Sequence, residues 1–216
     1  MDTTATPQNT EKHQFIPTLA HYEVLASLPI TLQTSKELFD YQIEKLKSKG
    51  LAGYDIADPF RNRLPEKGMF FLLIPPPPKV LKLDELMALV ELDGKTGVNY
   101  LDPVHITDLV EIPMTASVLL NVEDGRGRLN IKPMVSREEI KKEKRHPYTT
   151  WRGIIHVILF PRVLNHHNMD LVGSEYNGVN VPDLCSFGGK PTLHNGWEGS
   201  ANPRWGAPSA ESVLVP

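Results

Sequence analysis

The sequence predicts an α+β fold, a twisted and mostly antiparallel sheet of five or six short strands with three or four helices. Three observations lead to this expectation. Helical periodicity recurs in separate stretches, alternating apolar patterns flank Asp-Gly and Asn-Gly dipeptides, and nineteen prolines keep the regular elements short. The 216 residues, 40% hydrophobic and 23% charged, suffice for one domain.

We expect a flexible polar tail over residues 1–16, a single α+β domain over 17–210 and a short C-terminal tail over 211–216. The N-terminus lacks the pattern of a secretory signal, and no apolar run is long enough for membrane insertion. The single cysteine, Cys185, fits a reducing compartment, so we expect a soluble, cytoplasmic protein, although an organelle also fits. A net charge of −3 predicts no nucleic-acid partner.

The first half of the chain predicts a helix over 35–49. Thr34 and Glu37 make a capping box, and Gly50 follows the last turn. Four further elements are expected before the middle of the chain: a buried strand over 69–74, a stiff connector over 75–78, a short helix over 83–90 and a turn at Asp93-Gly94.

The middle of the chain predicts a hairpin and two helices. Residues 118–131 alternate apolar and polar side chains around Asp124-Gly125, which we place at the turn. A charged helix should run over 136–145 with Ser136 as its cap. Another should start at Thr150 and end before Pro161, because it has the strongest helical period of the chain.

The last quarter of the chain, 165–210, is rich in Gly, Trp and His, and we expect it to be largely irregular. A second hairpin around Asn177-Gly178 would join 169–176 to 179–186. The predicted core draws on nearly all of these elements: Leu38, Phe39, Ile43, Phe70, Leu72, Val118, Leu120, Leu129, Ile131, Ile154, Ile155, Ile158, Leu171 and Trp205.

The second hairpin brings two carboxylates to one face. In the expected register Asp170 lies opposite Cys185 and diagonal to Asp183, at roughly 7–8 Å between backbone positions. Carboxylates at such a distance can split their pKa values and act as acid and base, with His194 as a third catalytic candidate. The alternative is a pair of solvated carboxylates near the end of a strand.

Ligand binding and metal binding are also open in this region. Six side chains could form a stacking pocket with hydrogen-bonding arms, or a cap over the core: Tyr176, His194, Asn195, Trp197, Asn202 and Trp205. His167 and His194 are weak metal candidates, because their spacing matches no zinc motif and surface histidines explain them equally well. Either histidine with Cys185 has the residue types of a thiolate pair, but a small buried thiol is the alternative.

The order of several local sequences points to a known group of proteins. They are Phe-Leu-Leu-Ile at 71–74, Val-Leu-Leu-Asn-Val-Glu-Asp-Gly-Arg at 118–126, a Gly-Ile pair in the helix after Thr149, and Asn-Pro-x-Trp at 202–205. Together they resemble an uncharacterised bacterial family, a domain of unknown function seen mostly in actinobacteria, over roughly residues 35–209. The resemblance implies a shared fold unit and no established activity.

Two function classes stay open. The favoured one is a non-catalytic binding or assembly subunit with a protein partner on its N-terminal tail, since no complete catalytic motif occurs. The alternative is a small enzyme or ligand-binding protein with its site between the 169–186 hairpin and the segment of His194, Trp197 and Trp205. A concave pocket that gathers the two aspartates with His194 and Trp197 would favour the alternative. The sequence identifies no cofactor, oligomeric state or substrate, and leaves the peptide bonds before Pro182 and Pro203 open.

Overall fold

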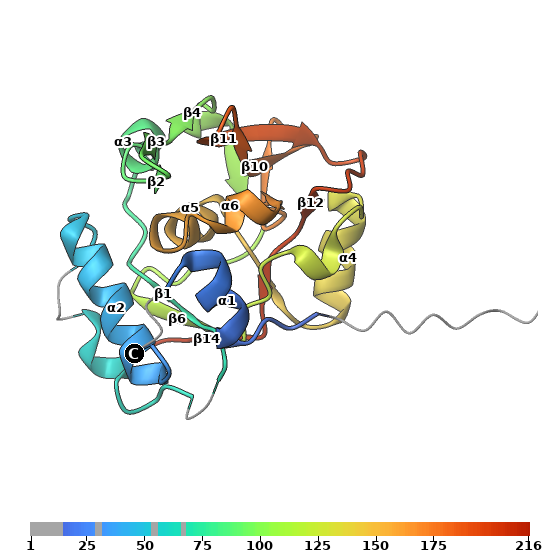
Figure 1. Cartoon of the computed structure of the whole chain (residues 1–216). Helices are drawn as coiled ribbons and strands as arrows, with labels where there is room; N and C mark the ends of the chain where they lie inside the picture. Colours follow the sequence, from blue (N-terminus) through green and yellow to red (C-terminus); the bar gives the residue numbers. More distant parts are fainter. Residues whose placement is uncertain (1–14, 29–31, 53–55, 66–67) are drawn as a thin grey trace, which may run out of the picture.

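The computed structural model describes residues 15–28, 32–52, 56–65 and 68–216, which form an α+β fold (Figure 1). This part of the chain has six α-helices where three or four were expected. They are α1 (Leu19–Ala26), α2 (Ser35–Ser48), α3 (Leu83–Met87), α4 (Pro133–Lys142), α5 (Thr150–Leu159) and α6 (Val163–His166). The sequence analysis missed α1 and α6, of which α1 has almost no amphipathic pattern and α6 is a single turn.

The strands form two sheets rather than one. The larger runs β12-β8-β10-β11-β4, with β9 beside β10 and β5 beside β9, and the smaller runs β1-β6-β14. Their bounds are β1 (Leu72–Ile74), β4 (Val98–Asn99), β5 (Ile106–Asp108), β6 (Ser117–Leu120), β8 (Asn168–Asp170), β9 (Ser174–Tyr176), β10 (Asn180–Phe187), β11 (Lys190–Trp197), β12 (Trp205–Gly206) and β14 (Ser212–Leu214). Two ribbons complete the set: β2 (Glu91–Leu92) with β3 (Lys95–Thr96), and β7 (His146–Pro147) with β13 (Ser209–Ala210). Only β11–β4 and β12–β8 pair in parallel among the described strands.

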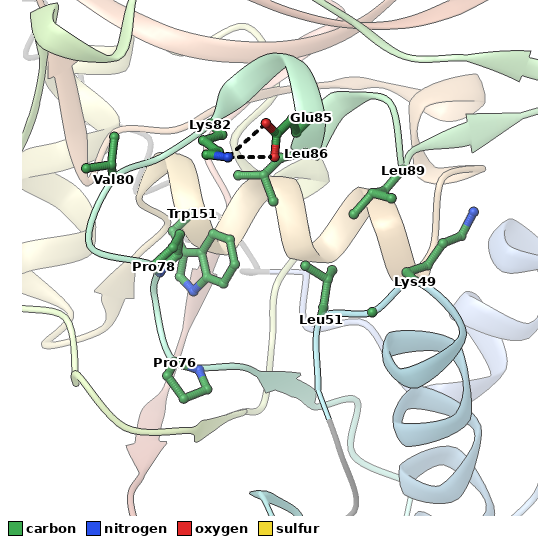
Figure 2. A pocket seen from close by; sticks show the side chains of 11 residues that line it. Lys49, Leu51, Pro76, Pro78, Val80, Lys82, Glu85, Leu86, Leu89 and Trp151 are labelled. Atoms are coloured by element: carbon green, nitrogen blue, oxygen red, sulfur yellow. Dashed lines mark hydrogen bonds and ion pairs between the residues drawn. The ribbon is translucent and has the colours of Figure 1, made fainter.

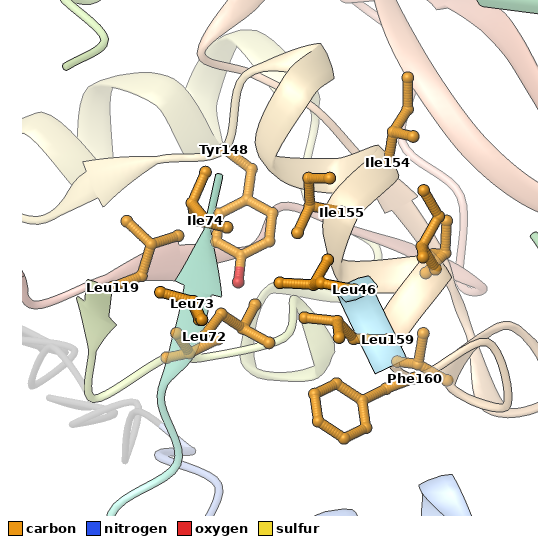
Figure 3. Close-up of a cluster of buried hydrophobic side chains, with 14 of the residues drawn as sticks. Leu46, Leu72, Leu73, Ile74, Leu119, Tyr148, Ile154, Ile155, Leu159 and Phe160 are labelled. Atoms are coloured by element: carbon orange, nitrogen blue, oxygen red, sulfur yellow. The ribbon is translucent and has the colours of Figure 1, made fainter. Parts of the chain in front are cut away.

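Helix α5 lies between the two sheets (Figure 1). Every one of its residues is buried, which explains why its sequence is apolar on nearly all sides. A Cβ on Gly153 would lie 2.4 Å from Leu171, so glycine permits the close approach of the helix to the larger sheet. Figure 3 shows Ile155 and Leu159 of this helix beside the side chains of β1. The core therefore runs through α5 and ties the two sheets together.

Helix α2 covers the smaller sheet and confirms the predicted capping box. The Thr34 hydroxyl accepts a hydrogen bond from the Glu37 backbone, and the Glu37 carboxylate accepts one from the Thr34 backbone. Gln42 of this helix bonds to the backbone at β1. Its side-chain amide donates to the Phe71 carbonyl at 3.0 Å and accepts from the Leu73 N–H at 2.8 Å. This pairing satisfies buried backbone groups at the sheet edge.

The predicted hairpin over 118–131 is wrong. Strand β6 ends at Leu120 and pairs with β1 and β14, while residues Arg126–Arg128 form a 3₁₀ turn. The Asp-Gly pair before this turn is buried, and Gly125, at φ 105°, packs against the backbone of Gly206. The Glu123 and Asp124 side chains bond to residues of the turn instead of facing solvent. The alternating pattern of the sequence therefore reflects a buried polar network and not a second strand.

Smaller corrections concern element ends. Helix α4 begins with Pro133 at its first turn, three residues before the predicted cap, and the cap of α5 is Thr149 rather than Thr150. Residues 212–214, which were assigned to a C-terminal tail, form strand β14. Four predicted core residues are only half-buried: Leu120, Leu129, Ile131 and Trp205.

The predicted N-terminal tail lies outside the described residues except for Phe15 and Ile16. The Phe15 ring lies 4.8 Å from the Arg126 guanidinium, in cation–π geometry. No described helix has the length and apolar character needed to span a membrane. The described chain contains no cis peptide bond, so the bonds before Pro182 and Pro203 are trans.

Candidate functional site

Three adjacent strands of the larger sheet place Asp170, Asp183 and His194 in one row. Asp183 on β10 pairs with Asp170 on β8 at one side and with His194 on β11 at the other. Directly paired residues on neighbouring strands have Cβ atoms about 4.5–5.5 Å apart. The two aspartates are therefore closer than the diagonal arrangement that the sequence predicted, and Cys185 pairs with Thr192 instead.

The register differs because residues 171–173 interrupt the hairpin between β8 and β9. The Leu171 N–H donates to the Pro182 carbonyl, and the Ser174 N–H donates back to the Leu171 carbonyl. Gly173 packs under Tyr148, where a Cβ would lie 2.7 Å from the Tyr148 carbonyl oxygen. This tight turn shifts the pairing partner of Asp170 from Cys185 to Asp183.

A cavity of about 440 Å³ opens over this row, between the sheet, the start of α4 and the chain after β11. We call it the aspartate pocket. Its lining residues are Pro133, Asp170, Asp183, His194, Asn195, Gly196, Trp197, Ser200, Asn202 and Trp205. It gathers the two aspartates, His194 and Trp197, which is the arrangement that the sequence analysis associated with an enzyme or a ligand-binding protein.

Burial sets the electrostatics of the two carboxyl groups. Asp170 is 5% exposed and Asp183 is 1% exposed. Burial raises the pKa of Asp170 to about 7, and burial together with the neighbouring Asp170 raises the pKa of Asp183 well above its ordinary value. Near neutral pH, Asp170 is therefore close to its midpoint, while the direction of the Asp183 shift favours its protonated form.

Asp183 is incompletely satisfied within the described structure. Its Oδ1 atom is buried and has no hydrogen-bond partner among the described residues. Its Oδ2 atom lies 3.9 Å from Nδ1 of His194, whose side chain is 55% exposed at the rim. A Cβ on Gly196 would lie 3.4 Å from the same Oδ2 atom, so glycine at this position leaves the carboxyl group open to the cavity.

Backbone hydrogen bonds and an ion pair fix the chain segments that form the rim of the pocket. The Arg137 guanidinium on α4 donates to the Glu198 carboxylate at 2.8 Å, and the Met134 N–H donates to the Glu198 carbonyl. Trp205 lies on β12, which pairs with β8, and its backbone N–H donates to the Asn202 carbonyl at 3.0 Å. The two tryptophans are thus positioned beside the aspartates, with Trp197 64% exposed.

A second cavity of about 390 Å³ adjoins the first on the same face of β10 and β11. We call it the apolar pocket. Tyr100, Cys185, Phe187 and Thr192 line it together with His194 and Trp205, which both cavities share. Burial and the nearby Asp183 raise the pKa of the Cys185 thiol to about 12, so the group is a thiol near neutral pH and lacks the character of a nucleophile.

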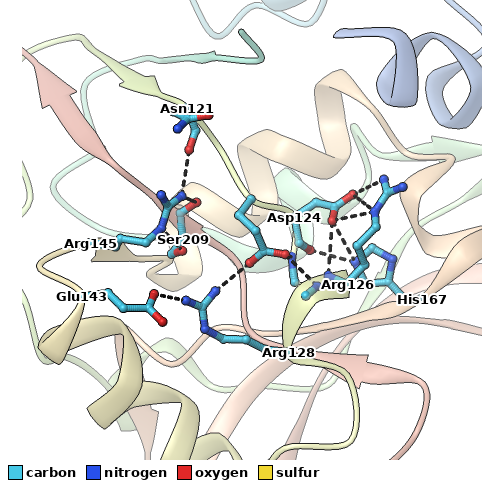
Figure 4. A network of polar contacts seen from close by, with 11 residues as sticks. Asn121, Asp124, Arg126, Arg128, Glu143, Arg145, His167 and Ser209 are labelled. Atoms are coloured by element: carbon cyan, nitrogen blue, oxygen red, sulfur yellow. Dashed lines mark hydrogen bonds and ion pairs between the residues drawn. The ribbon is translucent and has the colours of Figure 1, made fainter. Parts of the chain in front are cut away.

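Two other predicted residues lie elsewhere. Tyr176 sits on β9, with its ring 5.9 Å from that of His105. His167 is buried in the polar network of Figure 4, where its Nε2 bonds to the Asp124 carbonyl at 2.7 Å. No cluster of three or more metal-ligating side chains occurs in the described part of the chain, so His167 and His194 do not meet at a metal centre there.

The polar network of Figure 4 is structural. Arg128 bonds to Glu123 at 2.8 Å and also to Glu143, while Arg126 bonds to Asp124. Burial raises the pKa of Glu123 to about 7 despite the guanidinium beside it. Glu123 and Asp124 are each paired with an arginine, so we assign this network a role in the fold.

A further cavity, of about 410 Å³, lies between the proline connector and α3 (Figure 2). Two of its charged groups are paired with each other, since Lys82 bonds to Glu85 at 3.0 Å. The Trp151 indole N–H is likewise used, because it donates to the Pro75 carbonyl. No lining residue of this cavity has a buried polar side-chain atom without a partner among those described, which separates it from the aspartate pocket.

Sequence reasoning missed three residues of the aspartate pocket: Pro133, Gly196 and Ser200. The signal for Gly196 was present. Gly188-Gly189, both at positive φ, form the two-residue turn that joins β10 to β11. Such a dipeptide predicts a hairpin, and that hairpin would have placed Asn195 and Gly196 beside Asp183.

The chain belongs to a family of unknown function, DUF5701, whose match covers residues 33–207. The resemblance to an uncharacterised domain family is thereby confirmed. No curated protein and no solved structure matches the chain. The matched range includes every residue of the aspartate pocket and excludes the predicted tail over 1–16.

Proposed function

We propose that this protein binds a small organic molecule in the aspartate pocket, where Asp170 and Asp183 act on it as a base and an acid. One observation carries the proposal: Asp183, which lines an open cavity, has a buried carboxyl oxygen without a partner among the described residues. A buried polar group that lacks a partner costs free energy. A ligand that completes its hydrogen bonding is the simplest compensation.

The chemistry of the pocket supports this proposal. With a pKa of about 7, Asp170 can accept or release a proton near neutral pH, which is the range in which acid–base catalysis is most efficient. Asp183, whose pKa is raised further, can donate a hydrogen bond or a proton. Trp197 and Trp205 supply flat apolar surfaces, and Asn202 an amide, for orienting a ligand.

The family match adds a second argument. A function common to the family has to depend on residues inside the matched range, which holds the pocket and not the tail. The assembly-subunit hypothesis, which rested on the proline connector, the polar N-terminus and the absence of a catalytic motif, stays a prediction. A protein partner on the tail over 1–16, the lack of a nucleic-acid partner and a cytoplasmic location also stay predictions. We therefore favour ligand binding over assembly.

A ligand screen tests the proposal. Ligand-observed NMR with a fragment library of neutral, anionic and cationic compounds should give hits that compete with one another for one site. Asp183→Asn should weaken these hits at least tenfold, and Gly196→Val should abolish them, because its side chain covers Asp183 Oδ2. The control is Glu111→Gln, an exposed carboxylate outside the pocket.

The result that overturns the proposal is equally definite. Either the full library gives no hit, or every hit binds the folded Gly196→Val protein as well as it binds the unmodified protein. Thermal unfolding of each variant shows that a lost hit does not reflect a lost fold.

A further inference from the structure

The aspartate pocket contains two carboxyl groups and no basic side chain except His194. No Lys or Arg is among its ten lining residues. The nearby Arg137 on α4 donates to the Glu198 carboxylate and the Val172 carbonyl, and its Nη2 is buried without a hydrogen-bond partner among the described residues. No neighbouring cation lowers the pKa of Asp170, for which burial is the only cause of the shift. The side of the pocket formed by β8 and β10 is therefore complementary to a cation.

The titratable groups around the pair are few. Asp170 comes from β8, Asp183 from β10 and His194 from β11, while Cys185 lies one pair further along β10. Of these, only His194 can be positively charged, and its ring is at the rim. A cation between the aspartates would thus have two carboxyl groups as hydrogen-bond acceptors. None of the lining residues other than His194 is a positively charged side chain that would compete for them.

The adjoining apolar pocket extends the site in one direction. Residues 183, 185 and 187 point to the same face because strand side chains alternate. The face therefore changes from acidic at Asp183 to apolar at Phe187, which is largely exposed. His194 and Trp205 line both cavities, so one ligand can occupy both at once.

We propose that the ligand is a small organic amine, with its ammonium group between Asp170 and Asp183 and its apolar substituent against Cys185, Phe187 and Thr192. This inference rests on the proposed function and names the class of ligand. An ammonium donates up to three hydrogen bonds, enough for the unpartnered Asp183 oxygen and for Asp170. The face of Trp197 adds a surface that attracts cations.

A cation between the aspartates has a measurable consequence. Before a ligand binds, the raised pKa values favour the protonated form of Asp183 and leave part of a proton on Asp170 at pH 7. An ammonium favours the ionised carboxylates and lowers both pKa values. Binding therefore releases protons to solvent, and affinity rises as the pH rises from 6 to 8. A neutral ligand gives neither effect.

Calorimetry with four matched probes tests the inference: 2-phenylethylamine, ethylamine, 2-phenylethanol and phenylacetate. We expect 2-phenylethylamine to bind at least tenfold more tightly than the alcohol at pH 8, and more tightly than at pH 6. Titrations in two buffers of different ionisation enthalpy should show proton release. Phenylacetate should not bind.

Two variants test the aspartate pocket and the apolar pocket separately. Asp183→Asn should remove the preference for the amine over the alcohol, while Glu111→Gln should keep it. Phe187→Ser should weaken 2-phenylethylamine several-fold and leave ethylamine unchanged. Phe187 is largely exposed, so this variant should fold; thermal unfolding checks both.

The outcomes distinguish the two proposals. If 2-phenylethanol binds as tightly as the amine, or if amine affinity does not change with pH, the proposal of a cationic ligand is wrong. The proposal that the aspartate pocket binds a small molecule is then unaffected. If none of the four probes binds but the fragment screen finds neutral or anionic hits, the amine class is again wrong. If neither experiment finds any ligand, both proposals are wrong.

Discussion

Replacing Asp170 with Asn should make the protein more stable at pH 8 than the unmodified protein. Burial raises the pKa of Asp170 from 3.8 to about 7, so the folded state keeps a proton that the unfolded state has released. Because the folded state binds more protons, the free energy of unfolding falls as the pH rises between about 4 and 7. Asn has no charge and escapes this loss.

The size of the effect follows from the same values. Each pKa unit corresponds to about 1.4 kcal/mol, so a carboxyl moved from 3.8 to about 7 costs the folded state about 4 kcal/mol at pH 8. At pH 4 the same calculation gives under about 1 kcal/mol. Asp183 shares the site, and removing the charge of Asp170 also lowers the pKa of Asp183, which adds to the gain.

Urea unfolding at pH 4, 6 and 8 measures this difference. The stability of Asp170→Asn relative to the unmodified protein should grow steadily with pH, whereas the exposed control Glu111→Gln should stay within about 0.5 kcal/mol at each pH. An Asp170→Asn protein that is less stable at pH 8, or equally shifted at all three pH values, would refute the reasoning. Either result means that the carboxyl group is solvated or paired.

Three further predictions test the rest of the structure. Arg128→Met should lower the free energy of unfolding in urea by about 3–5 kcal/mol at pH 8, because it leaves the buried Glu123 carboxylate without its partner. The loss should be smaller at pH 5, where Glu123 can take a proton, and an equal loss at both pH values would contradict this. Gly206→Ala should lower stability by about 3 kcal/mol, since its Cβ would lie 1.9 Å from the Gly125 carbonyl oxygen, and unchanged thermal unfolding would rule out that contact. Cys185 should react with a disulfide reagent at pH 8 at least tenfold more slowly than free cysteine, because its thiol pKa is about 12; a rate like that of cysteine contradicts this.

Local signals predicted the helices well because a helix is specified by neighbouring residues. The Thr34 and Glu37 side chains and the apolar stripe of α2 all fall within one stretch of sequence, and the structure confirms that helix. The 118–131 hairpin failed for the opposite reason. Its Asp-Gly turn is stabilised by Arg126 and Arg128 and by the distant Gly206, and no alternating pattern records those contacts.

The site was predicted in its residues but not in its geometry. Seven of the named side chains meet in one pocket, although the expected register put Cys185 opposite Asp170. Register depends on whether a hairpin is continuous, and the turn at 171–173 is set by Gly173 against Tyr148, far away in the sequence. Tyr176 lies outside the pocket, on a strand that pairs with β5 and with the start of β10.

The position of the carboxyl pair argues that it is kept for a purpose other than stability. Each aspartate weakens the fold at neutral pH, and a neutral side chain of the same shape would remove that cost. The network around Glu123 shows how this protein treats buried acids that only support the fold, since each there has an arginine. Asp170 and Asp183 have no arginine and face a cavity instead. A ligand that pairs with the two carboxyl groups, as proposed above, would offset that cost.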